Sequence, residues 1–98
     1  MLIEVINQYL DLRRSERYAR YLQVTGLKQG SVVEIYRPWT GVKLDEGVEK
    51  DGLFVSKIEY KEGRRYQVVV RKAGYESLSV RTESRYTTVR MKKDLFYG

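Results

Sequence analysis

LFVSKIEYKEGRRYQVVVRKAGYESLSVRTESRYTTVRM, residues 53–91, carries the strongest structural signal of the chain. Four segments rich in Val, Ile, Tyr and Thr are separated by short gaps that contain turn formers such as Gly63, Gly74 and Ser84. Alternating segments of this kind, broken by turn residues, are typical of consecutive hairpins. The stretch therefore predicts an antiparallel β-meander whose strands cover residues 53–60, 66–72, 76–82 and 85–91.

The alternation of side chains along each predicted strand separates an inner face from an outer one. Tyr66, Val68 and Val70 share one face, and Val89 and Met91 continue the same apolar pattern in the last segment. The opposite face collects cations together with one tyrosine, and acids are scarce on it. We expect this outer face to carry Arg71, Arg81, Tyr86, Arg90 and Lys92.

Upstream of the meander, residues 31–37 alternate as a further strand and residues 42–51 form an acidic run. Pro38 ends ladder pairing, so Trp39 is expected in a loop, where it either anchors the core or lies exposed beside Arg37. The acidic run predicts a short edge strand or an ordered, solvated loop. Its spacing does not match the oxygen-ligand loop of an EF-hand, so no metal site is expected there.

The first 26 residues are expected to be helical. Residues 2–12 place their apolar side chains on one half of a helical wheel, with Glu4 and Asp11 on the other half. The apolar set that follows falls on the opposite side, which indicates a break near Ser15 and a second helix that Ser15 caps and Gly26 ends. Arg13, Arg14, Arg17 and Arg20 either form a phosphate-binding stripe at this junction or a solvated face.

A chain of 98 residues is expected to form one domain. Its helical segment would cover residues 1–26 and its β-rich segment residues 27–98. The predicted fold class is α+β: two N-terminal helices followed by a five- or six-stranded antiparallel β-meander. The short strands and tight turns fit a small SH3-like or OB-like barrel, or a strongly bent sheet, against which the first helix lies.

The charge is unevenly distributed along the chain. Residues 53–98 contain eleven Lys or Arg against five Asp or Glu, whereas residues 1–52 contain eight of each, so the net charge of +6 belongs to residues 53–98. Clustered cations contact phosphates, and tyrosine or tryptophan rings stack on unpaired bases. We therefore predict a small nucleic-acid-binding protein that contacts mainly the phosphate backbone, with DNA slightly favoured over RNA. The expected contact residues are Trp39, Arg64, Arg65, Arg71, Lys72, Arg81, Arg85, Tyr86, Arg90, Lys92 and Lys93.

An alternative prediction is a structural or protein-interaction module, such as a homo-oligomer or a subunit of a viral or plasmid assembly. Its support is the wide apolar arc of the first segment and the nine tyrosines, a residue favoured at interfaces. A homodimer would use the apolar half of that segment, and both functions can coexist if the dimer presents two basic sheets. The expected interface residues are Leu2, Ile3, Ile6, Tyr9 and Leu10.

Catalysis is not expected, because the chain lacks both His and Cys and shows no nucleophile elbow or phosphate-binding glycine loop. A small ribonuclease of the bacterial toxin type stays a lesser alternative, since Lys, Tyr and Glu can stabilise charge and move protons. No cofactor is expected. The absence of cysteine, of a signal-peptide pattern and of a long apolar run favours an intracellular, cytoplasmic protein without a membrane span. Sparse amide residues and abundant charge are also typical of proteins from hot environments.

Overall fold

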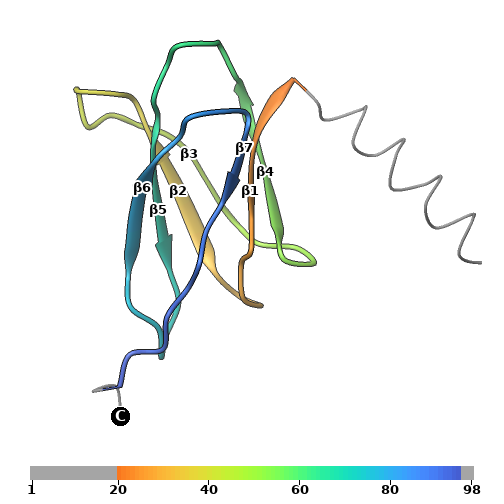
Figure 1. The fold of residues 1–98 in the computed structure, drawn as a ribbon, viewed down its shortest axis with the longest axis vertical. Helices are drawn as coiled ribbons and strands as arrows, with labels where there is room; N and C mark the ends of the chain where they lie inside the picture. Colours follow the sequence, from red (N-terminus) through yellow and green to blue (C-terminus); the bar gives the residue numbers. More distant parts are fainter. Residues whose placement is uncertain (1–19, 96–98) are drawn as a thin grey trace, which may run out of the picture.

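The computed structural model describes residues 20–95, which form seven β-strands and no helix. The strands are β1 (Tyr21–Thr25), β2 (Val32–Tyr36), β3 (Lys43–Val48), β4 (Leu53–Glu59), β5 (Gln67–Arg71), β6 (Leu78–Arg81) and β7 (Tyr86–Thr88). They build a three-stranded sheet in the order β4-β1-β7 and a four-stranded sheet in the order β3-β2-β5-β6 (Figure 1). The α+β prediction is therefore wrong for the described part of the chain, which is an all-β, two-sheet arrangement.

Residues 21–25 show why the predicted second helix is wrong. They form β1, the central strand of the three-stranded sheet, which pairs antiparallel with β4 and parallel with β7. Leu22 and Val24, two residues apart, are completely buried, as expected for alternate residues of a strand. This burial favours a strand at residues 21–25 over a continuation of the helical spacing of the residues before it. The predicted first helix, residues 2–12, and the predicted cap at Ser15 lie outside the described residues.

The predicted meander is also wrong in its connections, although its strands exist close to their predicted bounds. Of its consecutive pairs only β5 and β6 are hydrogen-bonded, because β4 and β7 both pair with β1 in the other sheet. Two facing sheets cover each other's apolar sides, whereas a single open meander leaves one side without a cover. The chain therefore adopts a two-layer sandwich and not the single small barrel or bent sheet that was expected.

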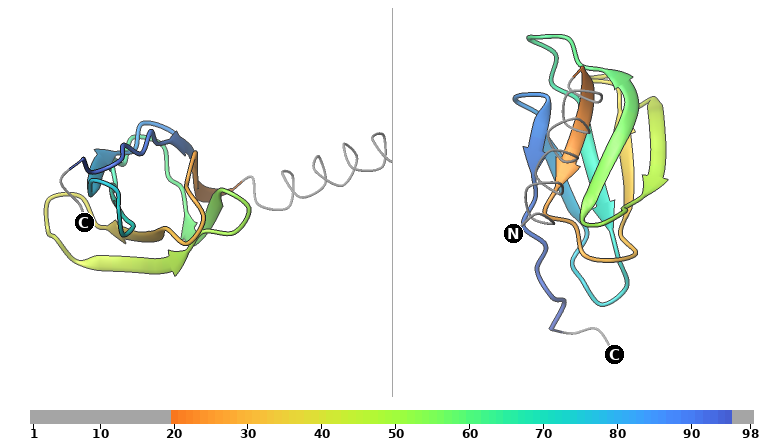
Figure 2. Two further views of the ribbon diagram at one scale, coloured as in Figure 1. Left: turned by 90° about the horizontal axis from the view of Figure 1, so that it is seen from below. Right: turned by 90° about the vertical axis from the view of Figure 1, so that its right-hand side faces the viewer.

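The inner faces predicted from alternation are confirmed. The end-on view in Figure 2 shows the two sheets facing each other across the interior. Leu22 and Val24 of the three-stranded sheet belong to the same core cluster as Val33, Ile35 and Val68 of the four-stranded sheet. The remaining buried apolar members are Leu27, Phe54, Tyr66, Val70, Val89 and Met91. Arg81 and Arg90 are exposed, as expected for the outer faces.

The acidic run contains an edge strand, as predicted, because β3 ends the four-stranded sheet. Its carboxylates nevertheless have structural partners and are not simply solvated. Asp45 accepts a hydrogen bond from the backbone N–H of Lys57 at 2.8 Å. Glu49 accepts hydrogen bonds from the backbone N–H groups of Gly30 and Gly52 at 2.7 and 2.8 Å, so it ties two turns together.

Candidate functional site

The turn between β2 and β3 presents Trp39 to solvent. Arg37 closes this turn by donating its backbone N–H to the carbonyl oxygen of Val42 at 2.8 Å. Trp39 has a φ of 69°, in the left-handed region that a bulky side chain rarely adopts. Its side chain is 88% exposed, so neither backbone preference nor burial explains a tryptophan at this position.

Arg81, at the end of β6, packs against Trp39. Its guanidinium carbon lies 4.9 Å from the centroid of the indole ring, within the range of a cation–π contact. The register of the four-stranded sheet explains the encounter, because Tyr36 pairs with Gln67 and Gln67 pairs with Arg81 across three neighbouring strands. Trp39 therefore lies close to the row of paired residues Tyr36, Gln67 and Arg81. One face of its ring contacts the guanidinium group of Arg81.

The loop between β4 and β5 adds two further arginines to the same place. Figure 1 shows this loop and the β2–β3 turn at the same end of the molecule. Between them lies an open pocket of about 550 Å³ lined by Arg37, Pro38, Trp39, Gly63, Arg64, Arg65 and Arg81. Four arginines thus line one pocket together with the indole ring, and the guanidinium group of Arg81 contacts the ring. We call this set, Arg37, Trp39, Arg64, Arg65 and Arg81, the Trp39 cluster.

The Trp39 cluster contains four cations and has two acidic neighbours in the sequence, Glu62 and Glu83. Within residues 20–95, no acidic side chain forms an ion pair with any of its four arginines. Glu62 lies in the same β4–β5 loop as Arg64 and Arg65, and Glu83 follows Arg81 by two residues; both are exposed. A surface with four cations and an exposed aromatic ring favours a ligand that is both anionic and planar.

Arg71, also expected in the site, has a structural partner on the outer face of the four-stranded sheet. Its Nε lies 3.3 Å from Oε1 of Glu34, and Nζ of Lys43 lies 3.0 Å from Oε2 of the same carboxylate. Tyr36 donates its hydroxyl to that Oε2 at 2.7 Å. The hydrogen bonds from Tyr36 and Lys43 hold the pKa of Glu34 below its usual range, and the same carboxylate raises the pKa of Tyr36.

The other predicted contact residues do not join the Trp39 cluster. Lys72 follows β5 near Gly30 and Glu49, while Lys92 and Lys93 pair with the backbone around Tyr75. Figure 1 places these three segments toward the end opposite the β2–β3 turn. Arg85 lies over the ring of Tyr86 at 5.7 Å, and Arg90 is exposed just after β7. The expected single basic face is thus divided into separate groups.

Four of the predicted contact residues, Trp39, Arg64, Arg65 and Arg81, therefore meet in one place, and Arg37 joins them. Arg37 was recognised in the sequence only as a neighbour of Trp39, because nothing local shows that the β4–β5 loop approaches it. Gln67 was not predicted as a site residue. It lines a small hollow together with Pro38, Trp39, Arg65 and Arg81, and it donates its side-chain amide to the hydroxyl of Ser79.

Across residues 20–95, no group of three or more acidic side chains comes together in a way that could hold a metal ion. The same part of the chain contains no helix that is long and apolar enough to cross a bilayer.

Comparison with known proteins gave no relative: no protein-family model, no curated protein and no solved structure matches this chain. The function proposed below is therefore based on the geometry of the Trp39 cluster.

Proposed function

We propose that this protein binds single-stranded nucleic acid through the Trp39 cluster. The observation that carries the proposal is an 88% exposed tryptophan in a left-handed backbone conformation. It lines one pocket with four arginines that form no ion pair with an acidic side chain among residues 20–95. An indole ring stacks on an unpaired base, and guanidinium groups contact the flanking phosphates. Neither interaction depends on base identity, so binding is expected to be largely independent of sequence.

The backbone of Trp39 supports a ligand-binding role. A left-handed conformation costs an L-residue with a large side chain about 1–2 kcal/mol, and strained positions of this kind are enriched at binding sites. Asn or Gly would fill the turn without that cost. An exposed tryptophan whose backbone conformation is unfavourable for a large side chain supports a role of the indole ring in binding a ligand.

The dimensions of the site favour unpaired nucleotides over a duplex. A volume of about 550 Å³ lies within the range of pockets that hold small organic ligands. Bases in a duplex have their faces covered by their neighbours, whereas a base in a single strand can turn toward Trp39. The preference for DNA over RNA, predicted from the sequence, has no separate support among the described residues, so both are compared below.

The test is fluorescence anisotropy with labelled single-stranded DNA, single-stranded RNA and duplex DNA over a salt series. Contact between four cations and a single strand should give a slope of log affinity against log salt of about −3. The double variant Arg64→Glu/Arg65→Glu should lose most of the binding. Lys92→Glu/Lys93→Glu is the matched control, because it changes the net charge equally at the opposite end, and it should weaken binding only a few-fold through long-range charge.

Two results would overturn the proposal. Equal losses in both double variants would show that net charge alone attracts the strand. Equal binding of polyglutamate, an anion without stacking bases, would show that the site takes an acidic polypeptide, for which Trp and Arg are also favoured contact residues.

A further inference from the structure

The strands β3 and β4 begin a hairpin that opens after its first residue pair. They are joined by the turn Asp51-Gly52, and the backbones of Lys50 and Leu53 exchange hydrogen bonds of 2.8 and 3.0 Å. Asp-Gly is a sequence typical of tight hairpins, whose strands stay paired beyond the turn. Within residues 20–95, however, no further pair joins these strands, because β3 belongs to the four-stranded sheet and β4 to the three-stranded one.

The opening leaves backbone groups of both strands directed into the space between them. Residues two apart in a strand direct their N–H and C=O groups to the same side. Val48 lies two residues before Lys50 and Val55 lies two residues after Leu53, so both direct these groups toward the other strand. In a regular hairpin they would be the next hydrogen-bonded pair. In the described part of the chain they do not pair, and each lies on the open edge of its sheet.

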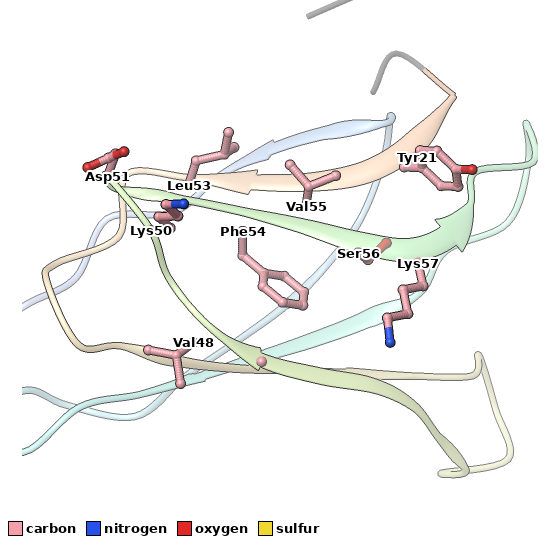
Figure 3. A pocket seen from close by; sticks show the side chains of 10 residues that line it. Tyr21, Val48, Lys50, Asp51, Leu53, Phe54, Val55, Ser56 and Lys57 are labelled. Atoms are coloured by element: carbon pink, nitrogen blue, oxygen red, sulfur yellow. The ribbon is translucent and has the colours of Figure 1, made fainter. Parts of the chain in front are cut away.

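The carboxylate of Asp45 lies between the two strands at the far end of the opening. Its oxygens accept hydrogen bonds from the backbone N–H groups of Glu46 in β3 and Lys57 in β4, both at 2.8 Å. These two residues would form the following pair of a regular hairpin, so the carboxylate takes the place of their mutual hydrogen bonds. Together with the bonds beside the turn, it bounds a groove of about 650 Å³ (Figure 3).

The floor of the groove is apolar. Figure 3 shows the ring of Phe54 pointing from β4 toward β3, where it lies against Gly47. A side chain at position 47 would collide with that ring, so the glycine permits the close approach. Val48 borders the groove and is 62% exposed, although it is an apolar strand residue. Apolar side chains of a ligand can therefore pack between Phe54 and Val48.

The two ends of the groove differ in charge. Figure 3 shows the side chain of Lys57 extending from β4 toward β3, and within residues 20–95 this lysine forms no ion pair. Asp45, beside it, is already bonded to two backbone N–H groups. At the turn, Lys50 and Asp51 carry opposite charges and leave that end neutral. A ligand that is apolar and carries a carboxylate at one end complements this arrangement.

We propose that the β3–β4 groove binds an extended peptide of another protein as an added strand. The backbone of the peptide exchanges hydrogen bonds with the open N–H and C=O groups of Val55, and those of Val48 face it from the other side. Apolar side chains of the peptide pack on Phe54, and an acidic residue at one end pairs with Lys57. Strand addition draws affinity from main-chain hydrogen bonds and selectivity from alternate side chains, and an open sheet edge is its usual template.

This inference is independent of the proposed function, since the Trp39 cluster and the groove share no residue. A single strand of nucleic acid and a peptide should therefore bind at the same time, and loss of one activity leaves the other in place.

Random peptides of about seven residues, displayed on phage, are the probe, because they are long enough to pass both ends of the groove. Peptides selected on the full-length chain should carry alternate apolar residues and an Asp or Glu at one end. The synthetic peptides should shift the amide resonances of Val48, Phe54 and Val55. Methylation of one backbone nitrogen that faces Val55 should weaken binding roughly tenfold, whereas methylation of the next nitrogen, which faces away, should have little effect.

A charge reversal on the protein tests the acidic end of the peptide. Lys57→Glu should weaken binding about fivefold or more, because it replaces an attraction with a repulsion. Lys61→Glu, an equal change of net charge at an exposed position outside the groove, is the matched control and should leave the affinity nearly unchanged.

The proposal would be overturned if no peptide is selected, if the shifted amides lie outside the groove, or if both methylated peptides bind equally well. Equal losses in Lys57→Glu and Lys61→Glu would contradict the pairing of the acidic end. Shifts of the same three amides that grow with protein concentration in the absence of peptide would assign the groove to a second copy instead.

Discussion

Replacing Trp39 with asparagine separates a binding role of this residue from a structural one. Asn has a small side chain that tolerates the left-handed region, so the turn can keep its φ of 69° at lower cost. The substitution removes the indole ring, its contact with Arg81 and the surface on which a base would stack.

The expected change in stability is small because its contributions oppose each other. With 88% of the side chain exposed, the ring buries only about 30 Å² and contributes roughly 0.7 kcal/mol of hydrophobic stabilisation. The exposed cation–π contact with Arg81 adds about 0.5–1 kcal/mol. Relief of backbone strain returns about 1–2 kcal/mol. The free energy of unfolding should therefore change by less than about 1 kcal/mol.

The expected change in binding is large by comparison. Loss of one base–aromatic stack costs about 1–3 kcal/mol, which corresponds to a roughly 5- to 150-fold weaker affinity for single-stranded DNA. Urea denaturation measures the stability, and fluorescence anisotropy measures the affinity at one fixed salt concentration. Leu95→Asn is the control, because Leu95 is also 88% exposed and lies outside the Trp39 cluster, and it should leave both quantities unchanged.

The reasoning would be refuted by either of two results. If Trp39→Asn binds single strands as tightly as the original chain, the exposed ring does not contact the ligand. If instead the free energy of unfolding falls by more than about 2 kcal/mol, the indole stabilises the fold in a way that its exposure does not reveal.

Two further predictions concern the fold. Gly26→Ala should lower the free energy of unfolding by about 2 kcal/mol or more in urea denaturation, because residue 26 has a φ of 82° and an added Cβ would collide with the carbonyl oxygen of Val89. Gly41→Ala, with a φ of 71° and no atom within 4 Å, is the strain-only control, and equal losses in both variants would contradict the steric contribution. Glu49→Gln should lower the thermal midpoint at neutral pH, because the charged carboxylate accepts the backbone N–H groups of Gly30 and Gly52, which lower its pKa. A lowered pKa means that this stabilisation is present above the usual value of 4.5 and is lost as pH falls through the folded-state pKa, so the difference between Glu49→Gln and the original chain should shrink in acid. The same midpoint for both at neutral pH would show that the carboxylate does not stabilise these turns; Glu62→Gln, at an exposed position, is the control.

The candidate site was only partly predictable. Arg64, Arg65 and Arg81 were recognised because the turn at Gly63 and the alternation along β6 make them exposed, and these signals are local. Their meeting with Trp39 depends on the pairing of β5 with both β2 and β6, which joins residues distant in the sequence. The same strand pairing brings Arg71 to Glu34, so this arginine forms an ion pair although it is exposed like the arginines of the Trp39 cluster.

Local side-chain patterns were enough to predict where most strands lie and which side of each strand faces the core. Val68 and Val70 illustrate this, since the alternation of a strand is a property of neighbouring residues. Three features depend on contacts between distant segments: the pairing of the strands, the strand at residues 21–25, and the convergence of the cations in the Trp39 cluster. The physical reason is that β1 pairs with β4 and β7, more than twenty-five residues away, and that Leu22 and Val24 are buried in a core shared with the facing sheet. No local pattern of side chains carries that information.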